Sequence, residues 1–207
     1  YGNNSDSQSD IDLTNINSGE GTSIQGETPD DLMGYSVAGL GDINGDGIDD
    51  FIIGAPLDST INSKAGSAYV IFGNESFHSQ STLNVSEITN GFVIRGSQTN
   101  GYLGIVSAAG DINGDGFNDI LLAERGHDNN GNEDAGIAHV IFGQETITSS
   151  STFDLNSLNG NNGFSIYGTQ SYDKLGAGLS GAGDVNGDGF DDILIGAPQD
   201  SSNNDSG

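Results

Sequence analysis

The sequence lacks cysteine and tryptophan, and it has only four lysine or arginine residues against 30 aspartate or glutamate residues. Without cysteine, no disulfide bond can stabilise the fold and no thiol nucleophile is available. The formal net charge of −26 excludes binding of nucleic acid or of an anionic membrane through the protein surface alone. No apolar run is long enough to span a bilayer, so direct membrane insertion is not expected.

What the sequence does contain is abundant glycine and one nine-residue pattern, D-x-N-x-D-G-x-x-D, that occurs three times. Oxygen side chains at positions 1, 3, 5 and 9 can converge on one ion if the loop curls tightly. The glycine at position 6 permits that curl, and position 7 offers its backbone carbonyl. We therefore predict three calcium loops and about three Ca²⁺ per chain. The predicted ligands are Asp42, Asn44, Asp46, Ile48, Asp50, Asp111, Asn113, Asp115, Phe117, Asp119, Asp184, Asn186, Asp188, Phe190 and Asp192.

Position 12 separates the known classes of calcium loop. An EF-hand requires a glutamate there between two helices, whereas this chain has Ile53, Leu122 and Ile195. Short aliphatic runs follow each loop, as in 51–53 and 120–122, and these are typical of buried strands. Each loop is therefore predicted to join two strands of a hairpin. The alternative is a plain Asn-Gly or Asp-Gly hairpin turn without metal, but the full ligand set at three sites favours calcium.

The loops belong to a longer repeat with a period of about 70 residues. Segment 66–73 matches 136–143, and segment 90–96 matches 162–168 and, more loosely, 21–26. Each unit therefore holds about four short strands separated by turns. This pattern predicts an all-β fold made of β-propeller blades, each of four antiparallel strands. An immunoglobulin-type sandwich is the alternative, although its strands would not repeat as a block.

Two segments carry a family resemblance: Met33-Gly34 with Gly54-Ala55-Pro56, and Leu175-Gly176 with Gly196-Ala197-Pro198, each pair bracketing a calcium loop. They resemble FG-GAP repeats, the blades of the integrin α-subunit propeller. Similar repeats occur in the propeller of glycosylphosphatidylinositol-specific phospholipase D and in bacterial surface proteins. The second unit departs from the pattern, because Ala123-Glu124-Arg125-Gly126 replaces Gly-Ala-Pro. The packing of this middle blade is therefore expected to differ.

The resemblance implies a propeller of about seven blades, so three repeats form an incomplete ring in one chain. We divide the array into units at 14–89, 90–158 and 159–207, with 1–13 as the tail of a preceding unit. Tyr1-Gly2 aligns with the end of a third strand, and Ser206-Gly207 aligns with the residues just before one. The chain is expected to be a fragment of a longer repeat protein. The alternative is an assembly in which chains complete each other's blades by strand addition.

No catalytic constellation is present, and we predict that the chain is not an enzyme. The three histidines, His78, His127 and His139, lie in different parts of the repeat, and His139 stands where the first unit has Tyr69. The acid pairs Asp49-Asp50 and Asp191-Asp192 could suggest glycosidase carboxylates. However, their second members are already predicted calcium ligands, and the middle unit has Asn118 at the position of the first.

Binding remains as the predicted activity. By resemblance, ligand-contacting loops lie on the face opposite the calcium loops. They correspond to 27–33, 97–103 and 169–175, and to 57–65, 127–135 and 199–207. Tyr35, Tyr102, Tyr172, Arg125 and His127 are their distinctive side chains. The expected partner is a protein or glycan ligand on this face, or a neighbouring copy of the chain. These loops could equally be solvated spacers of a rigid array.

We therefore expect a calcium-stabilised adhesion or protein-interaction module, secreted or on a cell surface. Acidic chains with weak calcium sites suit the millimolar calcium outside cells. Two alternatives stay open. One is a self-assembling structural subunit of a surface filament or lattice, and the other is a non-catalytic accessory region of a surface hydrolase.

Overall fold

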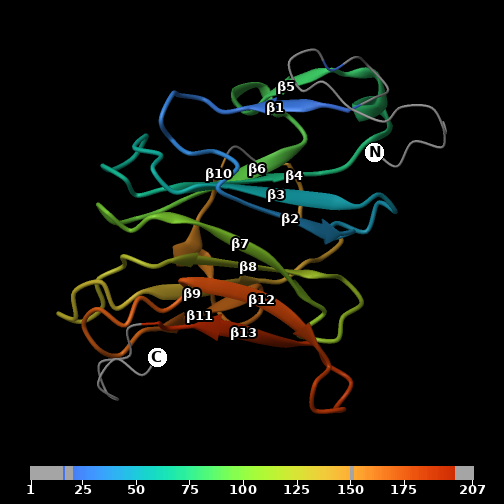
Figure 1. Cartoon of the computed structure of the whole chain (residues 1–207). Helices are drawn as coiled ribbons and strands as arrows, with labels where there is room; N and C mark the ends of the chain where they lie inside the picture. The colour runs from blue at the N-terminus through green and yellow to red at the C-terminus, as the bar shows by residue number, and fades with distance from the viewer. Residues whose placement is uncertain (1–15, 17–20, 150–151, 199–207) are drawn as a thin grey trace, which may run out of the picture.

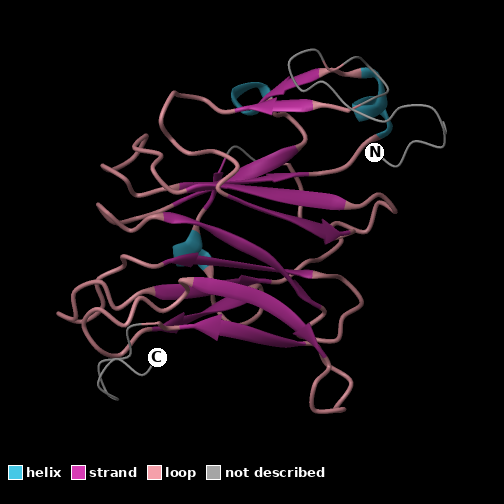
Figure 2. Cartoon of the chain, in the orientation of Figure 1, coloured by secondary structure: helices cyan, strands magenta, loops and turns pink. Residues whose placement is uncertain are grey.

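The computed structural model describes residues 16, 21–149 and 152–198, and its strands form a series of small sheets (Figures 1 and 2). The first blade contains β2 (Ser36–Gly41), β3 (Asp50–Ala55), β4 (Ser67–Ile71) and β6 (Gly91–Arg95), paired antiparallel in that order. The second blade repeats this order with β7 (Leu103–Gly110), β8 (Asp119–Glu124), β9 (Ile137–Ile141) and β11 (Gly163–Tyr167). The all-β prediction and the four-stranded blade are confirmed.

The third repeat contributes one hairpin to the described residues, made of β12 (Gly178–Gly183) and β13 (Asp192–Gly196). We call it the third hairpin. The three repeats therefore form an incomplete propeller, as predicted. The predicted tail 1–13 and the predicted loop 199–207 lie outside the described residues. Among the described residues, no helix is long and apolar enough to cross a membrane.

Short parallel strands connect one repeat to the outer edge of the one before it. β10 (Thr152–Phe153) leaves the second blade and pairs with β6 of the first. β5 (Thr82–Asn84) pairs in the same way with β1 (Ser23–Gln25). The pair β1–β5 therefore corresponds to the pair β6–β10. This agrees with the loose sequence match between 21–26, which contains β1, and 90–96, which contains β6.

The connections also contain three 3₁₀ helices: η1 (Glu75–Ser79), η2 (Val85–Glu87) and η3 (Leu155–Ser157). An Asx side chain caps each N-terminus, because Asn74, Asn84 and Asp154 accept hydrogen bonds from Ser76 N, Ser86 N and Asn156 N. Such short turns leave no apolar period, which is why the sequence pattern did not predict them.

The core lies between the blades rather than within them. Ile120 and Leu122 of β8 pack in the cluster shared with the first blade, and Leu121 packs toward Leu179 and Ile193 of the third hairpin. A strand covered on both faces needs apolar residues at every position. This explains the continuous aliphatic runs after each predicted calcium loop.

The boundaries of the sheets do not coincide with the boundaries of the units predicted from the sequence. β6 (Gly91–Arg95) is the fourth antiparallel strand of the first blade, whereas the sequence division at 90 grouped these residues with the following unit. The middle blade forms a complete sheet despite its departures from the repeat pattern. Its first strand, β7, has an additional register shift between Leu103 and Ile105, which β2 of the first blade does not have.

Candidate functional site

The three predicted calcium loops occupy the same place in three hairpins. They join β2 to β3, β7 to β8 and β12 to β13, and each follows a register shift next to its first strand's last residue, Gly41, Gly110 or Gly183. Figure 1 shows these loops on one side of the molecule and the loops that join β3 to β4 and β8 to β9 on the other. The hairpin placement predicted from sequence is therefore confirmed.

The aspartate at position 1 organises the backbone of each loop. Asp42 Oδ1 accepts hydrogen bonds from Gly45 N (2.7 Å) and Asp46 N (3.2 Å), and its Oδ2 accepts one from Gly47 N (2.8 Å). Asp111 and Asp184 accept the equivalent bonds in the second and third loops, at 2.7 to 3.1 Å. Three loops of different neighbouring sequence therefore adopt one hydrogen-bonded conformation.

The aspartate at position 9 ties two of the loops to the third strand of their blade. Asp50 is buried and accepts hydrogen bonds from Ile43 N (3.0 Å) and from Gly73 N (2.8 Å), just beyond β4. Asp119 accepts the same pair of bonds from Ile112 N and Gly143 N. In the third hairpin, Asp192 accepts a bond from Val185 N at 2.9 Å.

Burial raises the pKa of Asp50 to about 6, against the lowering effect of its two backbone hydrogen bonds and with the help of the nearby Asp46 and Asp42 charges. Burial likewise raises the pKa of Asp119 to about 6, and Asp115 and Asp111 add to the effect. A cation beside these carboxylates would relieve both causes, because it would neutralise the repulsion and compensate the lost hydration.

The donor chemistry of each loop fits a hard cation, since carboxylate, amide and carbonyl oxygens are the ligands that Ca²⁺ prefers. Within the residues that the structure describes, however, no group of three or more His, Cys, Asp or Glu side chains is placed to hold a metal ion. Calcium ligation by the fifteen residues therefore stays a prediction.

The calcium-loop pattern predicts no role for position 8, which is occupied by Asp49, Asn118 and Asp191. Asn118 Nδ2 donates to Leu40 O in the first blade (2.9 Å), and Asp191 Oδ2 accepts from Asp111 N in the second (2.9 Å). In the second and third repeats, position 8 thus contacts the preceding hairpin, either at the end of its first strand or at position 1 of its loop. The restriction of this position to Asp or Asn was the signal that could have revealed the contact.

The loops on the opposite face are bonded to one another rather than free. Asn100 N donates to Ser63 O (2.9 Å), and Asp128 N donates to Gln98 Oε1 (3.0 Å). Between the next pair of loops, Tyr172 Oη donates to Glu133 Oε2 at 2.6 Å. Arg125 lies over the ring of Tyr102, with 5.3 Å from its Cζ to the ring centroid. The predicted binding loops therefore form one continuous surface in the described part of the chain.

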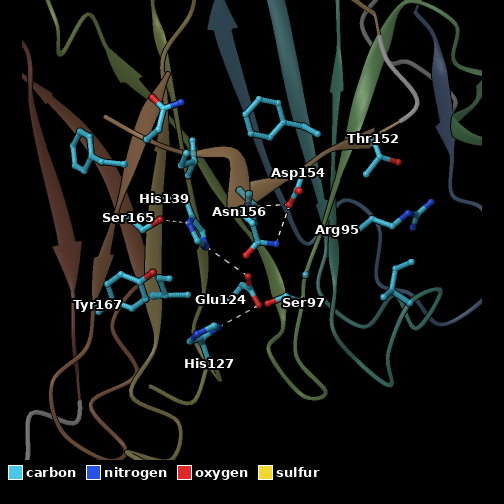
Figure 3. A pocket seen from close by; sticks show the side chains of 18 of the residues that line it. Arg95, Ser97, Glu124, His127, His139, Thr152, Asp154, Asn156, Ser165 and Tyr167 are labelled. Atoms are coloured by element: carbon cyan, nitrogen blue, oxygen red, sulfur yellow. Dashed lines mark hydrogen bonds and ion pairs between the residues drawn. The ribbon is translucent and has the colours of Figure 1, made fainter. Parts of the chain in front are cut away.

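A groove of about 650 Å³ opens beside this surface, between the outer strands of the two blades. Its lining includes Arg95, Glu124, His127, His139 and Tyr167 (Figure 3). The buried Glu124 carboxylate lies between the two imidazoles, 3.7 Å from His127 Nδ1 and 3.6 Å from His139 Nε2. Burial opposes ionisation of Glu124, but its interactions with His127 and His139 outweigh that effect and lower its pKa.

The first blade holds a different polar cluster at the same place. By strand register, Ala55 corresponds to Glu124, Tyr69 to His139 and Arg95 to Tyr167. Here the buried carboxylate is Asp58, which pairs with Arg95 (2.8 Å) and accepts from Tyr69 Oη (3.2 Å). The corresponding cavity is about 190 Å³. The replaced Gly-Ala-Pro of the middle unit therefore marks an altered polar cluster rather than a broken sheet.

Comparison with known proteins finds one repeat family and a set of related integrin alpha subunits. The FG-GAP repeat family model matches residues 33–71, 103–141 and 176–207. The chain is 33% identical over 177 residues to integrin alpha-V of Gallus gallus and 28% identical over 174 residues to integrin alpha-5 of Xenopus laevis, in each case over 82% of this chain and 14% of the relative. It is 31% identical to integrin alpha-PS5 of Drosophila melanogaster over 84% of this chain and 16% of that protein. The chain thus spans about one seventh of the length of these relatives.

Proposed function

Because the chain belongs to the FG-GAP repeat family, we propose that it is part of an extracellular adhesion or protein-interaction module in which calcium stabilises the three hairpin loops. The calcium is structural rather than catalytic. Its ligands are the predicted carboxylate, amide and carbonyl oxygens of the three loops. The module meets its partner on the opposite face.

One observation supports the calcium part of the proposal most strongly. In all three loops the position-1 aspartate collects the backbone N–H groups of positions 4, 5 and 6. A plain two-residue hairpin turn needs no such nine-residue arrangement. The raised pKa values of Asp50 and Asp119 are a second support, because buried carboxylates close to other acids gain from a bound cation.

The binding part of the proposal rests on the loops around 27–33, 57–65, 97–103, 127–135 and 169–175. They are positioned by rigid sheets, as binding loops commonly are. Tyr35 and Tyr172 expose about half of their surface there, and aromatic side chains are frequent anchors in protein interfaces. The partner is expected to be a protein, in line with the integrin alpha subunits that the chain resembles.

Calorimetric titration of chelator-stripped protein with CaCl₂ tests the proposal. We expect close to three sites per chain, and the variants Asp46→Ala, Asp115→Ala and Asp188→Ala should each lose one site. A matched control is Asp30→Ala, an acid outside the loops, which should keep the parent stoichiometry. Absence of calcium binding by folded parent protein would reject the calcium part of the proposal.

Self-association is a second candidate, favoured by the third hairpin. Within the described residues, β13 pairs only with β12, and Val185, Phe190 and Leu194 are 71%, 47% and 63% exposed. Open strand edges beside apolar surface favour strand addition. Light scattering over a range of protein concentrations tests this candidate, because a constant monomer mass would exclude it.

A further inference from the structure

Adjacent calcium loops are in direct contact through residues that are not themselves predicted to bind the ion through their side chains. The side chain of Asn118, at position 8 of the second loop, reaches the end of β2, just before the first loop, and donates to Leu40 O at 2.9 Å. Gly41, the next residue, immediately precedes the ligand Asp42. A Cβ atom on Gly41 would lie 2.2 Å from Asn118 Nδ2, so the side chain of Asn118 packs directly on the entrance of the first loop.

Phe117, at position 7, makes a second contact. Its carbonyl is a predicted ligand of the second loop, while its ring lies against Gly45 at the tip of the first loop. A Cβ atom on Gly45 would lie 2.8 Å from Phe117 Cε1. One residue therefore presents a ligand to its own loop and packs on the backbone of its neighbour.

The third loop contacts the second through the same two positions of the pattern, but here the position-8 side chain accepts a hydrogen bond instead of donating one. Asp191 Oδ2 accepts from Asp111 N (2.9 Å), and Asp191 N donates to Asp111 O (3.1 Å). The Phe190 ring lies against Gly114, where a Cβ atom would be 2.5 Å from Phe190 Cε1. The arrangement therefore occurs twice between different pairs of loops. It includes hydrogen bonds to Asp111, whose side chain organises the second loop.

A separate path joins the first two loops through the residues that follow β9, the third strand of the second blade. Asp119, at position 9 of the second loop, accepts from Gly143 N at 2.9 Å. The next residue, Gln144, donates its N–H to Ile43 O of the first loop at 3.0 Å. Fixing Asp119 thus also fixes a backbone donor to the first loop.

From these contacts we propose that the three loops bind calcium cooperatively, with Asn118 and Asp191 as positioning residues that transmit occupancy from one loop to the next. Position 8 lies between two predicted ligands, the carbonyl of position 7 and the carboxylate of position 9. Calcium in one loop immobilises both, and the immobilised position-8 side chain then holds the entrance of the preceding loop. The second ion binds to a loop that is already ordered, which lowers its entropic cost. The coupling acts in both directions. This inference rests on the proposed calcium function.

The chain supplies a matched control for the test. Asp49 occupies position 8 of the first loop and is exposed, whereas Asn118 occupies the same position of the second loop and contacts Leu40. Asp49→Ala and Asn118→Ala therefore truncate the side chain at the same position of the repeat, but only the second variant removes a contact with the preceding hairpin. Asp49→Ala also removes a negative charge beside the first loop.

Calcium titrations of the parent and both variants test the inference. We expect the parent to bind about three ions with a Hill coefficient clearly above 1. Asp49→Ala should keep this Hill coefficient, although the lost negative charge weakens calcium binding at the first loop. Asn118→Ala should keep three sites and lose most of the cooperativity. It should need several-fold more calcium for half-saturation, since coupling between sites typically changes an affinity by about 5–150-fold.

Two outcomes would overturn the inference: three independent sites in the parent, or the same Hill coefficient for Asn118→Ala and Asp49→Ala. Circular dichroism at saturating calcium shows whether Asn118→Ala folds. If it does not, Phe117→Leu replaces it as the test variant, because this change removes the ring contact with Gly45 and keeps the backbone carbonyl. A parent curve from Phe117→Leu would then reject the proposal. Complete absence of calcium binding by the folded parent would instead refute the proposed calcium function itself.

Discussion

Arg95 Nη1 donates to Asp58 Oδ2 over 2.8 Å, and this ion pair closes the outer part of the first blade. Asp58 is buried, and the Arg95 side chain keeps 15% of its surface exposed. At the register position of Arg95 the second blade has Tyr167, and its buried carboxylate, Glu124, faces two imidazoles instead. Two repeats of one chain therefore stabilise a buried carboxylate with different partners.

The first prediction concerns this ion pair. Arg95→Met should lower the free energy of unfolding by about 3 kcal/mol, because it leaves Asp58 buried without its cation. The control is Tyr167→Met at the equivalent, half-exposed position of the second blade, which should cost less than about 1 kcal/mol. Urea unfolding at saturating calcium measures both. Equal losses in the two variants would show that the ion pair does not stabilise the first blade.

The second prediction concerns the pH dependence of the second blade. Interactions with His127 and His139 outweigh burial and hold the pKa of Glu124 below its usual value. A carboxyl whose pKa is lowered in the folded state stabilises the protein above its unfolded pKa. That stability is lost as the pH falls through the folded pKa. The stability difference between the parent and Glu124→Gln should therefore be largest near neutral pH and should shrink as the pH falls below about 4.

Urea unfolding at pH 7 and at pH 3 measures this difference, with Glu133→Gln as the control. Glu133 is an acid of the neighbouring loop that bonds to Tyr172 at the surface. If the stability difference between the parent and Glu124→Gln is the same at both pH values, this result would contradict the lowered pKa of Glu124.

Much of the fold followed from the sequence, because the repeat constrained it three times. The aliphatic runs after each loop predicted β3, β8 and β13, and their place in hairpins was confirmed. The connections were harder to predict. β5 and β10 pair in parallel with strands of the preceding repeat, and these contacts depend on segments far apart in the sequence rather than on a local pattern.

The candidate site was also predictable only in part, because some of its contacts join segments that are far apart in the sequence. The pattern identified the loops, since glycine and acidic residues at fixed spacing act within one loop. It did not identify Glu124 as a buried acid, because the two imidazoles beside it come from a loop and from a neighbouring strand. The role of Asn118 in contacting Leu40 likewise depends on the packing of two blades.

The third prediction concerns calcium removal. Burial and neighbouring acids raise the pKa of Asp50 and Asp119 to about 6 in the absence of metal. A carboxyl whose pKa is raised in the folded state destabilises the protein as it ionises. The metal-free protein should therefore lose stability between about pH 4 and pH 7, by at most about 3 kcal/mol for each residue. Millimolar calcium should remove this loss or reverse its sign.

Thermal unfolding in chelator and in calcium at several pH values measures this effect. Asp119→Asn should flatten the pH dependence in chelator, because it removes one of the two raised groups, and it should also remove most of the stabilisation that calcium gives through the second loop. An unchanged slope in this variant would assign the pH dependence to other groups.

The last prediction separates backbone strain from contact between blades. Gly41, Gly110 and Gly183 all have positive φ, at 69°, 82° and 67°, so alanine at any of them costs about 1 kcal/mol or more from backbone strain alone. A Cβ atom on Gly110 would also lie 2.1 Å from Asp191 Oδ2, whereas one on Gly183 would meet nothing within 4 Å. Gly110→Ala should therefore destabilise the protein more than Gly183→Ala, by about 1–3 kcal/mol.

Only Gly110→Ala should displace the carboxylate of Asp191 from Asp111 N, which a shift of the Asp111 amide resonance in NMR would report. Equal destabilisation by the two variants, with the Asp111 amide unchanged, would mean that the second and third loops are not held together by this contact.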